Sequence, residues 1–196
     1  MKKNSLLFFL LVILLTACGQ NVKVNQTETN LNFSQSQIAN YFNYKYSLDE
    51  VNKVKKSETY DLYYYAADGR RYVFQNEDVY HSWFGDYNIK DLEMQTKETL
   101  YKTPLGGIVT LRPGSLLQTP TDPNIYLVVK NGQIRPFADK DLISKLYSNH
   151  EPVNIIILPN WFFSQYTVAD PINSISDFPV LPLQITIDED KGLYKL

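Results

Sequence analysis

The chain has 196 residues, of which 44% are hydrophobic and 14% aromatic, enough for one ordinary domain or two small ones. With 19 Lys and Arg residues against 21 Asp and Glu, it lacks the basic surface that nucleic acid or anionic lipid rewards, so we expect no nucleic-acid partner. A single cysteine excludes an intramolecular disulfide, and a hydrophobic core therefore has to hold the fold.

The first 17 residues have the pattern of an export signal. Lys2 and Lys3 supply a positive start, and Leu6–Leu15 is an uncharged apolar run too short to span a bilayer, which needs about 20 residues. Small residues then precede Cys18, and Leu15-Thr16-Ala17-Cys18 resembles the lipobox of bacterial lipoproteins. An ordinary signal peptide or a short N-terminal anchor with a chance cysteine is the alternative.

The lipobox resemblance implies that residues 1–17 are removed and that Cys18 carries acyl chains such as palmitate. Each buried methylene contributes about 0.8 kcal/mol, so two or three chains on one cysteine hold a protein at a membrane. We therefore expect an exported protein, anchored by lipid to the outer side of a bacterial membrane. Residues 18–36 are polar and predict a flexible tether.

Residues 37–56 are predicted as an N-terminal helical segment. Ile38 and Phe42 have helical spacing, and Ser47 with Glu50 has the spacing of a capping box. At the other end of the chain, residues 171–196 are rich in proline and predict an extended tail with a possible edge strand at residues 183–187.

The body of the chain contains an internal repeat. At an offset of 63, residues 61–74 align with residues 124–137, so that Tyr63 falls on Tyr126 and Phe74 on Phe137. Both copies are β-rich runs interrupted by Asp68-Gly69 or Asn131-Gly132. These pairs tolerate the positive φ of a type I′ turn and predict two-residue hairpins.

A helical pattern follows each predicted hairpin. Asn76 and Asp139 are placed to cap the two helices, and their apolar residues superpose at the same offset. We expect an α+β fold of two related β-hairpin-plus-helix modules packed together, with short strands dominant. The first module spans residues 57–107 and the second residues 108–170, with a short helix at 96–103 and an Arg-Pro-Gly-Ser turn at 112–115 between the hairpins.

Residues 60–170 resemble a tandem module found in exported and surface-layer-type bacterial proteins. The resemblance implies a surface-exposed structural or binding module and no reaction. In the second hairpin this chain has Pro136 where relatives have tryptophan, and because proline lacks an N–H donor we expect an edge strand there. The motifs that carry the resemblance are Tyr64-Tyr65…Asp68-Gly69-Arg70-Arg71-Tyr72-Val73-Phe74, Pro104-Leu105-Gly106-Gly107, Arg112-Pro113-Gly114, Thr121-Asp122-Pro123 and Trp161-Phe162-Phe163.

Motifs for metal or catalytic chemistry are not evident in the sequence. His81 and His150 are the only histidines, so we expect no metal site and no cofactor. A Ser82/His81/Asp set can be drawn, but its spacing does not demand it. The acidic run at residues 188–192 resembles the start of a calcium loop without its later ligands and is interpreted as a solvated tail.

The predicted contact points are the hairpin tips and the first hairpin's tyrosines: Tyr63, Tyr65, Asp68, Gly69, Asn131 and Gly132. Exposed tyrosines can stack on sugar rings, whereas buried ones would only pack the core. We expect a non-catalytic envelope module that binds cell-wall or surface glycan or a protein partner. A purely structural envelope subunit and an envelope-associated hydrolase are the alternatives.

Overall fold

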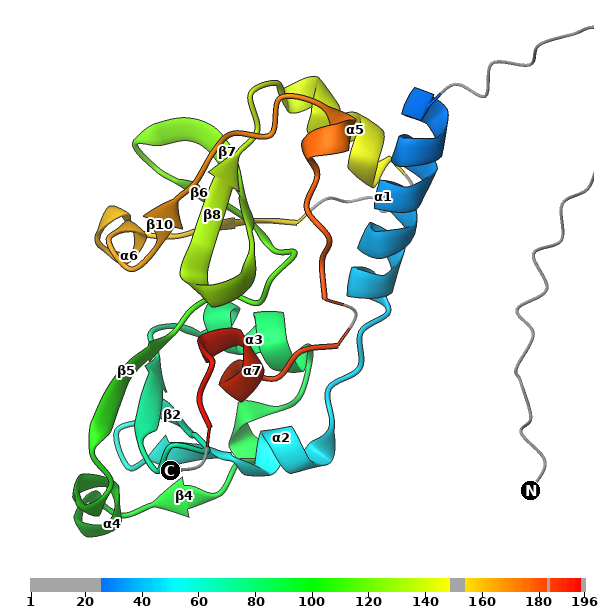
Figure 1. The fold of residues 1–196 in the computed structure, drawn as a ribbon. Coiled ribbons are helices and arrows are strands. Elements are labelled where there is room, and N and C mark those ends of the chain that lie inside the picture. The colour runs from blue at the N-terminus through cyan, green and yellow to red at the C-terminus, as the bar shows by residue number, and fades with distance from the viewer. Residues whose placement is uncertain (1–25, 149–153, 183, 195–196) are drawn as a thin grey trace, which may run out of the picture.

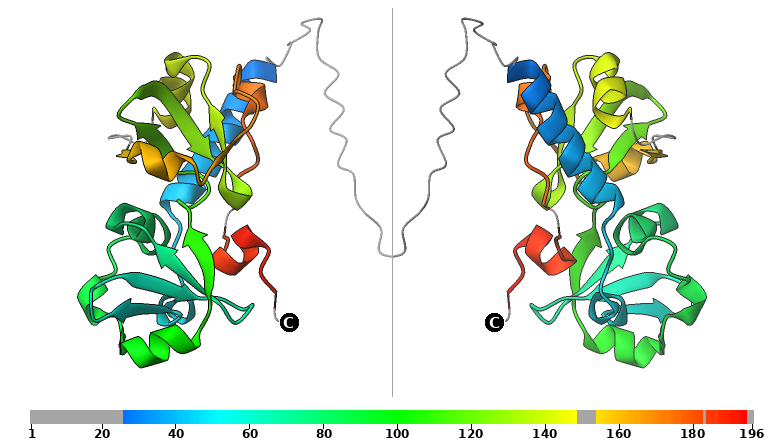
Figure 2. Two further views of the ribbon diagram at one scale, coloured as in Figure 1. Left: turned by 90° about the vertical axis from the view of Figure 1, so that its left-hand side faces the viewer. Right: turned by 90° about the vertical axis from the view of Figure 1, so that its right-hand side faces the viewer.

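The computed structural model describes residues 26–148, 154–182 and 184–194, and it has the expected α+β fold. Two five-stranded sheets of short strands form two lobes, with helix α1 (Gln26–Phe42) along one side (Figures 1 and 2). The predicted lipidation residue Cys18 and the histidine His150 lie outside the described residues.

The first sheet has the strand order β4-β1-β2-β3-β5. Strands β1, β2 and β3 pair antiparallel, whereas β4 pairs with β1 and β5 pairs with β3 in parallel. The strands are β1 (Val54–Ser57), β2 (Leu62–Tyr65), β3 (Arg71–Phe74), β4 (Met94–Gln95) and β5 (Leu105–Val109). The helical prediction for residues 37–56 was wrong at its end, where strand β1 begins. In β1, Val54 and Lys56 are buried and Lys55 between them is partly exposed.

The second sheet has the order β10-β8-β7-β6-β9. Its strands are β6 (Leu116–Thr119), β7 (Asp122–Val128), β8 (Gln133–Pro136), β9 (Ile155–Ile157) and β10 (Thr167–Val168). The prediction that the strand with Pro136 is an edge was wrong: β10 pairs with β8, and Ile172 N–H donates to the Pro136 carbonyl. Pro136 is tolerated because β10 contacts only the Gln133–Ile134 end of β8.

The internal repeat is larger than the two hairpins. Shifted by the same offset, β1, β2, β3, β4 and β5 fall on or beside β6, β7, β8, β9 and β10, and the pairing orders of the two sheets coincide. Helices α3 (Glu77–Phe84) and α5 (Lys140–Tyr147) follow the hairpins at equivalent positions. Asn76 and Asp139 cap them through their side chains, as predicted. The two lobes are therefore two copies of one unit.

The two hairpin turns differ in geometry. In the second, Asn131 (φ 62°) and Gly132 (φ 65°) both have positive φ, as predicted, but Val129 N–H donates to the Gln133 carbonyl, so three residues rather than two lie between the closing pair. In the first, Gly69 has φ 77° but Asp68 does not share it, so the prediction of a two-residue turn was wrong. The Asp68 carboxylate instead accepts hydrogen bonds from Arg70 N–H and the Tyr72 hydroxyl, which favours a longer turn over residues 66–70.

Helix α1 begins at Gln26, well inside the segment predicted as a tether. Ser34, Gln37 and Ile38 are buried, and Gln35 Nε2 donates to the Lys145 carbonyl at the end of α5, 2.8 Å away. This polar helix is therefore held by tertiary packing, which its weak apolar pattern does not reveal. The other helices are α2 (Leu48–Asn52), η1 (Ile89–Asp91), α4 (Lys97–Lys102), η2 (Lys130–Gly132), α6 (Asn160–Phe163), η3 (Ile175–Asp177) and α7 (Ile187–Lys191).

Helix α7 joins the two copies through two buried carboxylates. Asp188 accepts from Ala67 N–H in the first hairpin turn at 2.9 Å, and Asp190 accepts from Asn131 N–H in the second, also at 2.9 Å. The carboxylates are 7% and 2% exposed. The interpretation of this run as a solvated tail was therefore wrong, as was the predicted edge strand, because Thr186 caps a helix that packs Ile187 into the core.

We predict that Asp190→Asn and Asp190→Ala have different effects on stability. Burial raises the pKa of Asp190. An Asp with a raised folded pKa loses stability as pH rises from the unfolded value, near 4, through the folded one. Asp190→Asn, which keeps an acceptor for Asn131, should remove this decline. Asp190→Ala should cost about 1–3 kcal/mol by leaving that N–H unpaired. Urea unfolding at several pH values tests this, and equal losses in both variants would contradict it.

Candidate functional site

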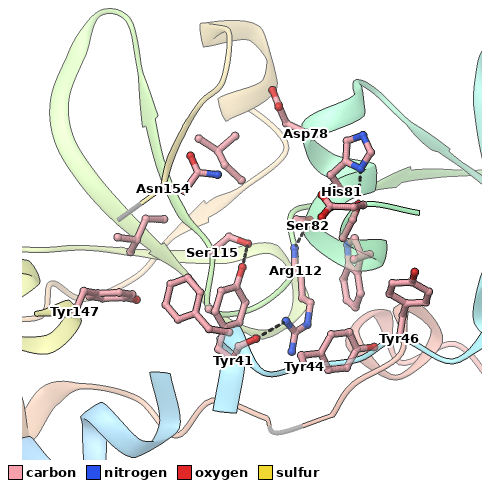
Figure 3. Close-up of a pocket in the computed structure, with 17 residues that line it drawn as sticks. Tyr41, Tyr44, Tyr46, Asp78, His81, Ser82, Arg112, Ser115, Tyr147 and Asn154 are labelled. Atoms are coloured by element: carbon pink, nitrogen blue, oxygen red, sulfur yellow. Dashed lines mark hydrogen bonds between the residues drawn. The ribbon is translucent and has the colours of Figure 1, made fainter. Parts of the chain in front are cut away.

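A pocket of about 370 Å³ lies where the two copies and the N-terminal segment meet (Figure 3). Its wall includes the C-terminal end of α1 with Tyr44 and Tyr46 after it, the outer face of α3, the turn that joins β5 to β6, and the C-terminal part of α5. The pocket therefore draws on both copies and on a segment outside the repeat. Residues that line it include Tyr41, Tyr44, Asp78, His81, Ser82, Asp86, Arg112, Gly114, Ser115 and Asn154.

Residues 110–115 connect the two copies and are all buried. Because buried backbone groups must be paired, side chains of both copies bond to this linker. Trp83 Nε1 donates to the Thr110 carbonyl at 2.8 Å, Leu111 N–H donates to the Tyr166 hydroxyl at 3.0 Å, and Arg112 N–H donates to Ser82 Oγ at 3.1 Å. These bonds fix the backbone that carries Arg112.

The Arg112 side chain is 2% exposed, yet none of the three ion pairs among the described residues includes it. Its Nη1 donates to the Tyr41 carbonyl at 3.4 Å, while Nε and Nη2 have no hydrogen-bond partner. Burial lowers the pKa of Arg112, and the nearby Tyr41 and Tyr44 hydroxyls only partly offset this. A guanidinium stays charged in proteins, so the site holds a buried cation with two free donors.

Two tyrosine rings cover the guanidinium. Its carbon lies 3.5 Å from the ring centroid of Tyr44 and 4.6 Å from that of Tyr41, within the range of cation–π attraction. The Tyr41 hydroxyl lies 3.0 Å from Ser115 Oγ, and a Cβ at Gly114 (φ 98°) would come within 2.5 Å of the Tyr41 ring. Glycine at position 114 thus gives Tyr41 room beside Arg112.

The polar rim of the pocket is acidic. Asp78, Asp86 and His81 are exposed, and Figure 3 shows Asp78 and His81 above Arg112 on α3. His81 Nδ1 lies 2.5 Å from the Gly85 carbonyl, and Ser82 Oγ donates to the Val79 carbonyl at 2.7 Å. Ser82 Oγ is thus bonded to backbone atoms, since it also accepts from Arg112 N–H.

The predicted contact residues lie away from this pocket. Tyr63 and Tyr65 are half-buried on β2, with the Arg71 guanidinium 5.2 Å from the Tyr63 ring centroid and the Tyr65 hydroxyl buried. Asp68 and Gly69 form the first hairpin turn, and Asn131 and Gly132 the second. Both turns contact α7, where Asp188 and Asp190 accept hydrogen bonds from the N–H groups of Ala67 and Asn131.

Arg112 and its two tyrosines were missed as site residues, because the sequence suggested only a turn at residues 112–115. The turn exists, since Ser115 N–H donates to the Arg112 carbonyl at 3.1 Å. The available signal was one arginine inside the otherwise uncharged run of residues 108–117. That Tyr41 and Tyr44 stack on it depends on long-range packing.

No known protein family matches the chain, and a search of curated proteins finds no relative by sequence. Within the described ranges, no His, Cys, Asp and Glu side chains gather in threes as a metal site. Over the same residues, none of the helices is both long and apolar enough to cross a membrane.

We predict that the ring of Tyr44, rather than its hydroxyl, stabilises Arg112. Tyr44→Leu removes the closer π face and should lower the free energy of unfolding by about 0.5–2 kcal/mol. Tyr44→Phe loses only a 3.4 Å hydrogen bond to the Ile185 carbonyl and should change it by less than about 0.5 kcal/mol. Urea unfolding of both variants measures the difference, and equal losses would assign the effect to the hydroxyl.

Proposed function

We propose that the protein is a lipid-anchored, non-catalytic binding module of the bacterial cell envelope, and that its ligand binds in the pocket between the two copies. The observation that carries the binding role is Arg112, a buried guanidinium with two unpartnered donors on the wall of that pocket. Leaving charged donors unpaired inside a protein costs stability, which a ligand that pairs them would restore.

The aromatic wall supports an envelope glycan or a protein segment as the ligand. Tyr41, Tyr44 and Tyr46 line the pocket beside Phe42 and Trp83. Such rings offer flat apolar faces with polar edges, a surface that suits sugar rings and peptide groups. The pocket, with a volume of about 370 Å³, is also large enough for a sugar unit or a few peptide atoms.

The anchoring part of the proposal rests on the N-terminal sequence. The short apolar run and the lipobox-like residues before Cys18 support export and lipid attachment. Helix α1 begins at Gln26, so seven residues separate Cys18 from the described part of the chain.

We predict that filling the pocket abolishes binding to envelope material. His81→Trp places a large ring at an exposed position on the pocket wall. Ser144→Trp is the matched control, because Ser144 is exposed at the equivalent position of α5 and does not line this pocket. Lipidated full-length protein in detergent would be mixed with purified cell-wall and surface glycan, and the bound fraction measured over a range of protein concentration.

The proposal expects saturable binding by the wild type and the Ser144→Trp control, and at least tenfold weaker binding by His81→Trp. Loss of binding in Tyr63→Ala/Tyr65→Ala, with His81→Trp unaffected, would move the site to the first hairpin. Absence of saturable binding by the wild type would overturn the glycan-binding role.

A further inference from the structure

We propose that the pocket binds a carboxylate group, held in plane by the Nε and Nη2 donors of Arg112. This assignment rests on the proposed function and names the chemistry of the ligand. The two donors lie side by side on one edge of the guanidinium, at the spacing of the two oxygens of a carboxylate. Both lack a hydrogen-bond partner in the described structure.

The tyrosine rings restrict how a ligand can approach. The Tyr44 and Tyr41 ring centroids lie 3.5 Å and 4.6 Å from the guanidinium carbon, so both rings pack against Arg112. Nη1 already donates to the Tyr41 carbonyl. The edge of the guanidinium that carries Nε and Nη2 therefore selects a group that accepts two parallel N–H bonds in the guanidinium plane, as a planar carboxylate does.

The charges around the pocket disfavour a second negative charge on the ligand. Arg112 is the one Lys or Arg among the described residues that line it, and Asp78 and Asp86 are acidic rim residues. Sites for phosphate monoesters add further cationic or backbone donors to balance a charge near −2. One guanidinium can neutralise a single negative charge, whereas Asp78 and Asp86 repel any anion and repel a dianion more strongly than a monoanion.

Access to the free edge requires only local movement. Nε and Nη2 are buried, but Tyr41 and Tyr44 beside Arg112 are both half-buried residues of the pocket wall. The Tyr44 hydroxyl is held by one long hydrogen bond of 3.4 Å. Rotation of Tyr44 would give up this bond and its contact with Arg112, about 0.5–2 kcal/mol, which the two charge-assisted hydrogen bonds of a bound carboxylate can offset.

Calorimetric titration of the lipidated full-length protein in detergent tests the assignment. N-acetylalanine presents a peptide-type carboxylate, and glucuronate presents a sugar carboxylate. N-acetylalanine amide is the matched neutral probe, and inorganic phosphate is the competing anion. The proposal expects at least one carboxylate to bind at least tenfold more tightly than the amide and than phosphate. Which of the two binds better distinguishes a peptide terminus from an acidic sugar.

Arg112→Lys keeps the charge but loses the paired donors, and it should weaken carboxylate binding at least tenfold. Arg71→Lys is the matched control and should leave binding within twofold. Arg71 is also a buried arginine over a tyrosine, 5.2 Å from the Tyr63 ring centroid, but it is absent from this pocket wall. The comparison of acid with amide in the wild type holds even if Arg112→Lys fails to fold.

Equal binding of acid and amide, or tighter binding of phosphate, would overturn the carboxylate assignment. So would the absence of binding by both carboxylates, which would leave water as the partner of the two donors. If envelope glycan still bound and His81→Trp still blocked it, the proposed function would stand while this assignment failed. Loss of both results would remove the pocket as a site.

Discussion

Residues 110–115, the buried linker between the two copies, constrain the rest of the structure. A linker inside a protein must have its backbone groups paired, and here Trp83, Ser82 and Tyr166 supply the partners. These bonds bring α3 of the first copy and the α6–β10 connection of the second against one short segment. The hydrophobic core is consequently continuous across both sheets, from Val54 to Leu158. Arg112 projects from this fixed backbone, which explains how a cation is retained inside the protein.

The candidate site arises where the duplication ends. The two sheets repeat the same strand order, and α3 and α5 repeat the same helix, but the linker, the segment with Tyr41 and Tyr44, and helix α7 belong to neither copy. Helix α7 uses Asp188 and Asp190 to hold one hairpin turn of each copy, while α1 packs against α5. A duplicated scaffold with a site at its seam is consistent with the general observation that ligand pockets form preferentially between packed units.

Local signals in the sequence were enough to predict the hairpins, the caps of α3 and α5 and the α+β class, because Asn131-Gly132, Asn76 and Asp139 act within a few residues of themselves. Features that depend on distant partners were not predicted. Helix α1 has a weak apolar pattern, the acidic residues of α7 accept N–H bonds from two distant hairpin turns, and the strand that ends at Pro136 is paired at its other end by β10. The site could not be predicted for the same reason, since Arg112 and Tyr41 are 71 residues apart along the chain.

The unpaired Nε and Nη2 donors of Arg112 are proposed to bind a carboxylate ligand. The most direct test is nuclear magnetic resonance of the Arg112 Nε–H group, assigned by its absence in Arg112→Lys, during titration with N-acetylalanine and glucuronate. The account predicts that a binding carboxylate shifts this signal downfield and slows its exchange with water, while the Arg71 Nε–H signal, also from a buried and unpartnered group, stays in place. An Arg112 signal that is unmoved at saturating concentrations of both compounds would contradict the claim.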